Sequence, residues 1–378
     1  MPSSSSPSGF SPSWGEGPGA RPECSSRARG YSAGKQSLVP PIQRSRPDLR
    51  VPRERGTITV STSTVRAVGV TTYGGPDALQ VVDVPAQELG PTEVRVRVTA
   101  ATVNPTDTYT RNGSRSKTGT PRGAADVPGM DIAGTLVEIG ENAQTSLSVG
   151  DRVMGIVVPR DEHGANREDV VLPAQSIAAA PRDADDIAAS TLPMNGLTAR
   201  RALDLLGLKP GEVLAVTGAA GSTGGYVVQL AKHAGLIVVA DASEADQELV
   251  RSLGADQIVR RGDGVAERIL ELYPDGVDGL FDGAVQDDVV LPAVKTGGGV
   301  ATVRWYQGDG SRDLKVHAVS VADMAEEQGK LDELRQLAED GVVTLRVADS
   351  YSPADAWRAH ERLEAGGTRG RLVIDFRR

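Results

Sequence analysis

Residues 215–235 read AVTGAAGSTGGYVVQLAKHAG, in which an apolar run, a glycine-rich turn and a segment with helical apolar spacing follow one another. The order indicates the strand, turn and helix of a βαβ unit. Glycines at 218, 221 and 224 let the backbone turn tightly and approach a ligand closely, because they carry no Cβ. Free amides at the helix start then face a phosphate group. We therefore predict a cradle for the pyrophosphate of a dinucleotide; a plain helix-start turn is the alternative.

An acidic residue follows where such a unit would hold the sugar. The next apolar run, LIVVADA, brings Asp241 to its end, 20 residues after Gly221. A carboxylate at this place accepts hydrogen bonds from the ribose hydroxyls of the adenosine half. The same charge repels the 2′-phosphate of NADPH. Together these signals predict an NAD(P)H site that favours NADH.

Strands and helices alternate through the second half of the chain. The runs VLAVTG, LIVVADA, DQIV and GVDGLFDGAV each precede a predicted helix, the last ending near VKTGGG, and VATVRW closes the series. Short, fully apolar strands between helices indicate a parallel sheet covered on both faces. From Val65 to about Asp183 the chain instead shows short strands with Gly and Pro turns, and Val94, Val96 and Val98 alternate in one of them. This part predicts a β-rich domain of barrel or sandwich type.

The predicted fold class is therefore α/β, with a β-barrel domain and a doubly wound parallel-sheet domain. Residues 1–60 are rich in Ser, Pro, Gly and Arg, lack a hydrophobic period and are predicted to be a disordered extension. Residues 61–185 form the predicted barrel domain, and residues 186–310 form the predicted dinucleotide-binding domain. Residues 311–378 carry a helical segment and two strands, TLRVADSYS and RGRLVIDF, that are predicted to return to the first domain.

Composition and charge narrow the classes of partner. The net charge of −9 and the pI near 5.2 give a nucleic-acid partner no electrostatic support. The apolar stretches fall far short of the roughly 18 residues that a membrane helix needs. The single cysteine, Cys24, forms neither an internal disulfide nor a Cys-rich metal site. These features predict a cytoplasmic protein without a nucleic-acid or membrane partner.

From Val65 to Arg378 the motifs resemble those of the medium-chain dehydrogenase/reductase superfamily, and within it the zinc-free quinone oxidoreductase (zeta-crystallin-like) branch. The resemblance runs in order through YGGPDALQVVDVP, AATVNPTDTYTRNG, LPMNGLTARRALDLLGLKPGEVLAVTGAAGSTG and HERLEAGGTRGRLVIDF. It implies a GroES-like β-barrel domain, an inserted Rossmann domain and a cofactor cleft between them. It also implies hydride transfer from NAD(P)H to a quinone, and a homodimer in which GGVATVRWYQG presents an edge strand.

The residues that hold zinc in alcohol dehydrogenases of this superfamily are missing here. Residues 61–378 contain no cysteine, and the four histidines are scattered at positions 163, 233, 317 and 360. Zinc needs several thiolate or imidazole ligands that converge in a tetrahedron. The sequence therefore predicts no metal site, and an electrophile that needs no Lewis acid, such as a quinone or an activated alkene.

The resemblance also implies the site residues. It places Asn104 and Tyr109 at the nicotinamide as the catalytic pair, where Tyr109 would donate to the developing oxyanion; a packing role for this tyrosine is the alternative. Arg251 or Arg261 would reach a 2′-phosphate, and Arg261 stands where relatives often have a tyrosine. The residues expected to bind or shape the cofactor site are Asp107, Thr198, Gly218, Gly221, Ser222, Thr223, Gly224, Asp241 and Arg261.

Three functions stay open from the sequence. Zinc-independent quinone reduction is the main prediction. Reduction of an activated C=C bond by an enoyl or alkenal reductase of the same superfamily is the first alternative, because the same fold and cofactor serve both reactions. A cofactor-binding protein with little turnover, as lens crystallins of this branch illustrate, is an alternative of another class.

Overall fold

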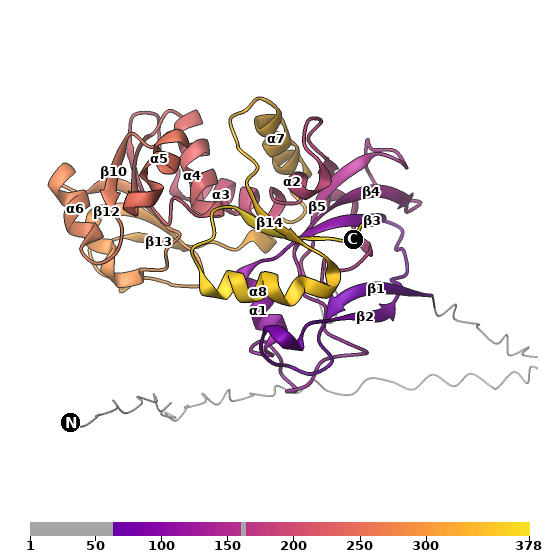
Figure 1. The fold of residues 1–378 in the computed structure, drawn as a ribbon. Helices are drawn as coiled ribbons and strands as arrows, with labels where there is room; N and C mark the ends of the chain where they lie inside the picture. The colour runs from indigo at the N-terminus through magenta and orange to yellow at the C-terminus, as the bar shows by residue number, and fades with distance from the viewer. Residues whose placement is uncertain (1–62, 160–163) are drawn as a thin grey trace, which may run out of the picture. The chain divides into compact units, whose positions relative to one another are not determined.

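The structure is a computed structural model that describes residues 63–159 and 164–378. The predicted disordered extension, residues 1–60, lies outside the described residues. Most strands fall into one sheet of seven strands and one of six (Figure 1). None of the helices in the described ranges is long and apolar enough to cross a membrane.

The seven-stranded sheet joins the first and the last part of the described chain. Its order is β14-β15-β3-β4-β5-β7, and β6 also pairs with β3. The alternating valines of β3, Val94, Val96 and Val98, are at most 2% exposed, as their period predicts. The last strand, β15, pairs with β3 so that Val373 lies opposite Thr102. The strands are β3 (Glu93–Thr102), β4 (Asp131–Ile139), β5 (Arg152–Ile156), β6 (Asp169–Pro173), β7 (Ile177–Ala179), β14 (Val347–Tyr351) and β15 (Arg371–Asp375), beside a separate hairpin of β1 (Thr64–Gly69) and β2 (Gln80–Pro85).

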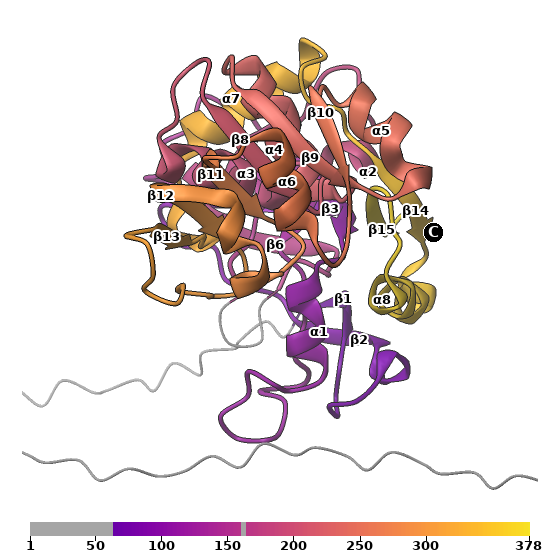
Figure 2. The ribbon, with the colours of Figure 1, turned by 90° about the vertical axis from the view of Figure 1, so that its left-hand side faces the viewer.

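The six-stranded sheet is parallel throughout and has the order β10-β9-β8-β11-β12-β13 (Figure 2). In chain order this is 3-2-1-4-5-6, the doubly wound arrangement whose order reverses between β8 and β11. Ligands of such sheets bind at the carboxyl ends of the strands beside that reversal. The strands are β8 (Val213–Thr217), β9 (Ile237–Ala242), β10 (Gln257–Arg260), β11 (Val277–Asp282), β12 (Val294–Thr302) and β13 (Lys315–Ala318).

Helices cover both faces of the six-stranded sheet, as predicted. On one face Val216 of β8 lies in a core cluster with Leu197 and Tyr226, which come from α3 and α4. On the other face the neighbouring Ala215 lies in a cluster with Ile269 of α6, and Figure 1 shows α6 on the opposite side of the sheet from α3 and α4. The helices are α1 (Pro105–Arg111), α2 (Asp186–Ala189), α3 (Pro193–Leu206), α4 (Ser222–His233), α5 (Gln247–Ser252), α6 (Val265–Leu272), α7 (Gln328–Glu339) and α8 (Ala356–Ala365).

The segment after β11 corrects the prediction of a helix that ends near VKTGGG. It forms two short 3-10 helices, η4 (Asp287–Val289) and η5 (Leu291–Ala293), and VKTGGG belongs to β12. Val285 and Asp287 have positive φ values of 56° and 51°, so the chain turns where a helix would have to begin. The glycine run that follows is a poor helix former, which favours the strand.

The expectation that GGVATVRWYQG presents an edge strand is wrong. Its first five residues, 298–302, end β12, and β12 pairs with β13, with Gly299 opposite Lys315. Arg304 and Trp305 adopt positive φ values of 62° and 72° and turn the chain after β12. The short strand β13 is therefore the edge on this side of the sheet, and its mixed sequence KVHA gave little periodic signal. The limits of the two domains stay a prediction.

Candidate dinucleotide site

The glycine turn between β8 and α4 is shaped by close backbone approaches. Gly218 has a φ of +67°, and a Cβ there would lie 2.8 Å from the carbonyl carbon of Gly283 after β11. A Cβ at Gly224 would lie 2.3 Å from the carbonyl oxygen of Gly218, far inside van der Waals contact. Gly221 precedes the helix, and Ser222 and Thr223 open it. The first amides of α4 have no partner within the helix, so they are available to an anion.

Asp241 lies at the end of β9 beside this turn and is only 3% exposed. One carboxylate oxygen, Oδ1, accepts the amide of Ala219 at 3.2 Å and so braces the glycine turn. The other oxygen, Oδ2, is buried and has no hydrogen-bond partner among the described residues. Burial raises the pKa of the Asp241 carboxyl, while the Ala219 amide and the charge of Arg261 oppose that shift. A buried acceptor without a donor fits a ribose hydroxyl.

A cavity of about 180 Å³ opens at the carboxyl ends of β8, β9 and β11, the place where the strand order reverses. The predicted residues Gly218, Gly221, Asp241 and Arg261 all line it, and Arg261 is exposed. The rest of the lining comes from Ala220, Ala242, Asp246, Gly283, Ala284, Gly367 and Arg369. The structure thus brings the predicted turn, the acid and the arginine together at one cavity.

Two arginines of the C-terminal part reach this region, and the sequence prediction missed both. Arg346 donates to the carbonyl oxygens of Ala220 and Gly221 at 3.1 and 2.7 Å, on the turn itself. Arg369 pairs through two nitrogens with the carboxylate of Asp246 at 2.5 and 2.7 Å, and these bonds lower the pKa of Asp246. Each contact spans more than 100 residues, so a local pattern could not reveal it.

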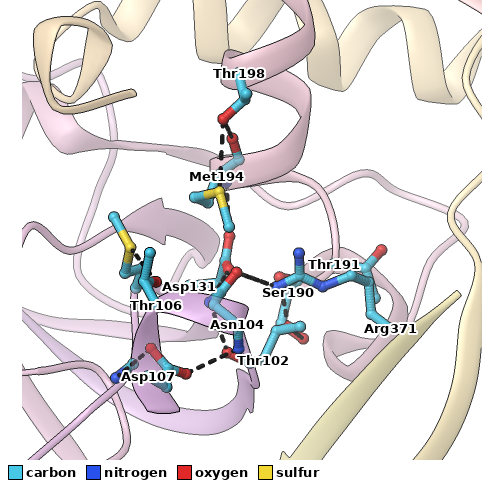
Figure 3. Close-up of polar contacts among 12 residues, drawn as sticks. Thr102, Asn104, Thr106, Asp107, Asp131, Ser190, Thr191, Met194, Thr198 and Arg371 are labelled. Atoms are coloured by element: carbon cyan, nitrogen blue, oxygen red, sulfur yellow. Dashed lines mark hydrogen bonds and ion pairs between the residues drawn. The ribbon is translucent and has the colours of Figure 1, made fainter. Parts of the chain in front are cut away.

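Asn104 lies in a second polar cluster, where α3 meets the seven-stranded sheet (Figure 3). It is fully buried; its Nδ2 donates to Thr102 O at 3.0 Å and to Asp131 Oδ2 at 2.9 Å, and its Oδ1 accepts from Arg371 at 2.6 Å. Asp131 also pairs with Arg371 at 3.0 Å and accepts the amide of Met194 at 2.6 Å. Both amide hydrogens and the oxygen of Asn104 are thus engaged, which suits a positioning role.

Asp107 ties α1 to the chain before β4. Its two oxygens accept the amides of Asn104 at 2.9 Å and Gly129 at 3.1 Å. Burial and then the nearby charge of Asp131 raise the pKa of Asp107 to about 7, although the two amides act against the shift. Asp107 therefore shapes the loop that carries Asn104.

Tyr109 and Thr198 differ in how free their hydroxyls are. Tyr109, on α1, is half-buried, and the guanidinium of Arg115 lies 5.3 Å from the centre of its ring. Within residues 63–159 and 164–378 its hydroxyl has no hydrogen-bond partner. The buried hydroxyl of Thr198 donates to Met194 O at 2.7 Å, one turn back in α3. The Tyr109 hydroxyl is thus free to donate to a ligand, whereas the Thr198 hydroxyl donates within its own helix.

The described residues hold no group of three or more His, Cys, Asp or Glu that could bind a metal ion. Residues 90–182 match the family described as "Alcohol dehydrogenase GroES-like domain", and residues 253–374 match the one described as "Zinc-binding dehydrogenase". The word zinc in the description of the second family does not show that this chain binds zinc. The zinc-free site therefore stays a prediction.

Known proteins resemble the chain over most of its described length. A quinone oxidoreductase of Pseudomonas aeruginosa is 32% identical over 80% of this chain and 97% of its own. A chloroplastic NADPH-dependent alkenal/one oxidoreductase of Arabidopsis thaliana is 34% identical over 61% of this chain and 60% of its own. The solved quinone oxidoreductase of Coxiella burnetii superposes with a TM-score of 0.72 at 26% identity, over 83% of this chain and 99% of that one. The chain therefore belongs to the quinone-oxidoreductase-like branch of the medium-chain dehydrogenase/reductase superfamily of oxidoreductases.

Proposed function

We propose that this protein reduces a quinone with NAD(P)H and without a metal ion. One observation carries the proposal: a strand–glycine–helix turn and a buried acceptor without a partner, Asp241 Oδ2, lie at one cavity beside the reversal of the sheet. The amides at the start of α4 suit a pyrophosphate, and the free oxygen suits a ribose hydroxyl. When bound, the nicotinamide would supply the hydride.

The chain's own residues would hold and orient the reactants. Tyr109 has a hydroxyl free to donate to the oxygen that gains charge as a quinone is reduced. Asn104 and Asp107 would act by position, because their polar atoms fix α1 against β4 and Arg371. In this proposal Tyr109 touches the substrate, and Asn104 and Asp107 keep Tyr109 in place.

NADH is the proposed preferred cofactor. A carboxylate at the ribose repels a 2′-phosphate, and Asp241 lies at the end of β9 where that sugar would bind. The name of the Arabidopsis relative, an NADPH-dependent enzyme, supports the other choice, and Arg261 and Arg369 at the same cavity offer positive charge. Fluorescence titration of the protein with NADH and NADPH decides between them.

A second function rests on the relatives. The alkenal/one oxidoreductase of Arabidopsis favours reduction of an activated C=C bond as the alternative. NAD(P)H consumption with 1,4-naphthoquinone or phenanthrenequinone, compared with 2-alkenals, tells the two apart. Cofactor binding without consumption on either panel would instead identify a binding protein with little turnover.

A homodimer and a cytosolic location complete the proposal. One edge strand of the six-stranded sheet is β13, which would extend the sheet across a two-fold axis. Sedimentation equilibrium of the purified protein measures the oligomeric state, and a monomer at all concentrations would remove this part.

A further inference from the structure

We propose that Asp246 sets the choice between NADH and NADPH by holding Arg369 away from a phosphate on the ribose. The inference rests on the proposed cofactor and names the residue that regulates its recognition. Both side chains line the cavity that holds Asp241. They come from connections of different sheets, since Asp246 follows β9 of the six-stranded sheet and Arg369 precedes β15 of the seven-stranded sheet.

Both carboxylate oxygens of Asp246 accept hydrogen bonds. Arg369 Nε lies 2.5 Å from Asp246 Oδ1, and Arg369 Nη2 lies 2.7 Å from Oδ2. Ser243 also donates to Oδ2 of the same carboxylate at 2.5 Å. The Asp246 side chain is 8% exposed, whereas that of Arg369 is 32% exposed. The carboxylate is therefore fixed, whereas the guanidinium, whose remaining nitrogen Nη1 donates to Thr368 O at 3.2 Å, stays partly exposed.

Charge decides what such an arrangement recognises. The lining has two carboxylates, Asp241 and Asp246, and two guanidiniums, Arg261 and Arg369, which sum to zero. A guanidinium binds a phosphate through two parallel N–H bonds, the same geometry that it uses with a carboxylate. While Asp246 occupies those donors, a 2′-phosphate must compete with a fixed, partly buried anion. A ribose diol needs no such competition.

Removing the charge of Asp246 should release the arginine. Asp246→Asn keeps the size of the side chain, and the sum of charges at the cavity becomes +1. Charge-assisted bonds from a freed guanidinium should tighten binding of a 2′-phosphate at least about tenfold. A ligand that lacks this phosphate should bind about as before.

The test uses two probes that differ only in that group, adenosine 5′-monophosphate and adenosine 2′,5′-bisphosphate, in calorimetric titrations of the full chain. Asp246→Asn is expected to improve the dissociation constant of the bisphosphate alone. The matched control is Asp256→Asn, which removes an aspartate just before β10 that pairs with Lys232 of α4 at 2.7 Å, outside the cavity lining. It should change neither constant.

A second variant keeps the inference testable if Asp246→Asn folds poorly. Arg369→Gln leaves Asp246 without its cation, so binding of the bisphosphate should weaken more than binding of the monophosphate. Equal changes for both probes in either variant would show that the pair is only structural and would overturn the inference. If the wild type binds neither probe, NADH nor NADPH, the proposed function fails as well; if it binds them and only the expected change is missing, the inference alone fails.

Discussion

Gly224→Ala tests whether the turn after β8 is a built cradle. The added Cβ would lie 2.3 Å from Gly218 O, 2.8 Å from the carbonyl carbon of Gly218 and 3.0 Å from Cα of Ala219. All three atoms are backbone, so no side chain can swing away. The turn itself must move, and Gly218 is already held against Gly283.

Two opposing effects give the size of the change. Alanine in place of a helical glycine stabilises by about 1 kcal/mol. Forcing an extra carbon into a packed site costs about 1–3 kcal/mol. We therefore expect the free energy of unfolding of Gly224→Ala to fall by up to about 2 kcal/mol. Displaced amides should weaken NADH binding at least about tenfold, the loss of about one charge-assisted hydrogen bond.

Urea unfolding measures the first quantity, and fluorescence titration with NADH measures the second. The control is Gly329→Ala in the first turn of α7, where a Cβ meets nothing within 4 Å. That variant should keep NADH affinity and gain up to about 1 kcal/mol of stability. A Gly224→Ala protein that is as stable as Gly329→Ala and binds NADH like the wild type would refute the proposed packing of the turn.

Three further changes probe other parts of the molecule. Burial and then the charge of Arg111 lower the pKa of His360 to about 3; the unfolded chain therefore binds the proton first as pH falls below about 6.5, and between pH 7 and 5 urea unfolding should show a loss of about 2 kcal/mol that His360→Gln lacks. Asp131→Asn leaves Arg371 buried without its anion, so unfolding should cost about 3 kcal/mol less, and wild-type stability in this variant would contradict the pairing. Tyr109→Phe should lower kcat for quinone reduction about tenfold, the loss of about one hydrogen bond, and leave the dissociation constant of NADH unchanged; an unchanged kcat would favour the packing role.

Local patterns were enough for the parts of the site that lie within one βαβ unit. The turn at 218–224 and the acid at Asp241 are separated by one helix, and glycine spacing and apolar runs report such neighbours directly. The parallel sheet followed from fully apolar strands for the same reason. The segment at 285–293 escaped because positive φ values at Val285 and Asp287 override its apolar spacing.

Two arginines of the C-terminal part show why the other contacts of the site could not be predicted from the sequence. Arg346 and Arg369 lie just before β14 and β15, two strands of a sheet built mainly from residues before 180, yet they contact the glycine turn and Asp246. An arginine in a loop has no periodic signal, and its partner is fixed only when two distant sheets pack. Because β15 also carries Arg371 to Asn104 and Asp131, one C-terminal segment touches both polar clusters. A substitution at Arg369, the nucleotide end of this segment, should therefore also shift α1, where Tyr109 would contact the substrate.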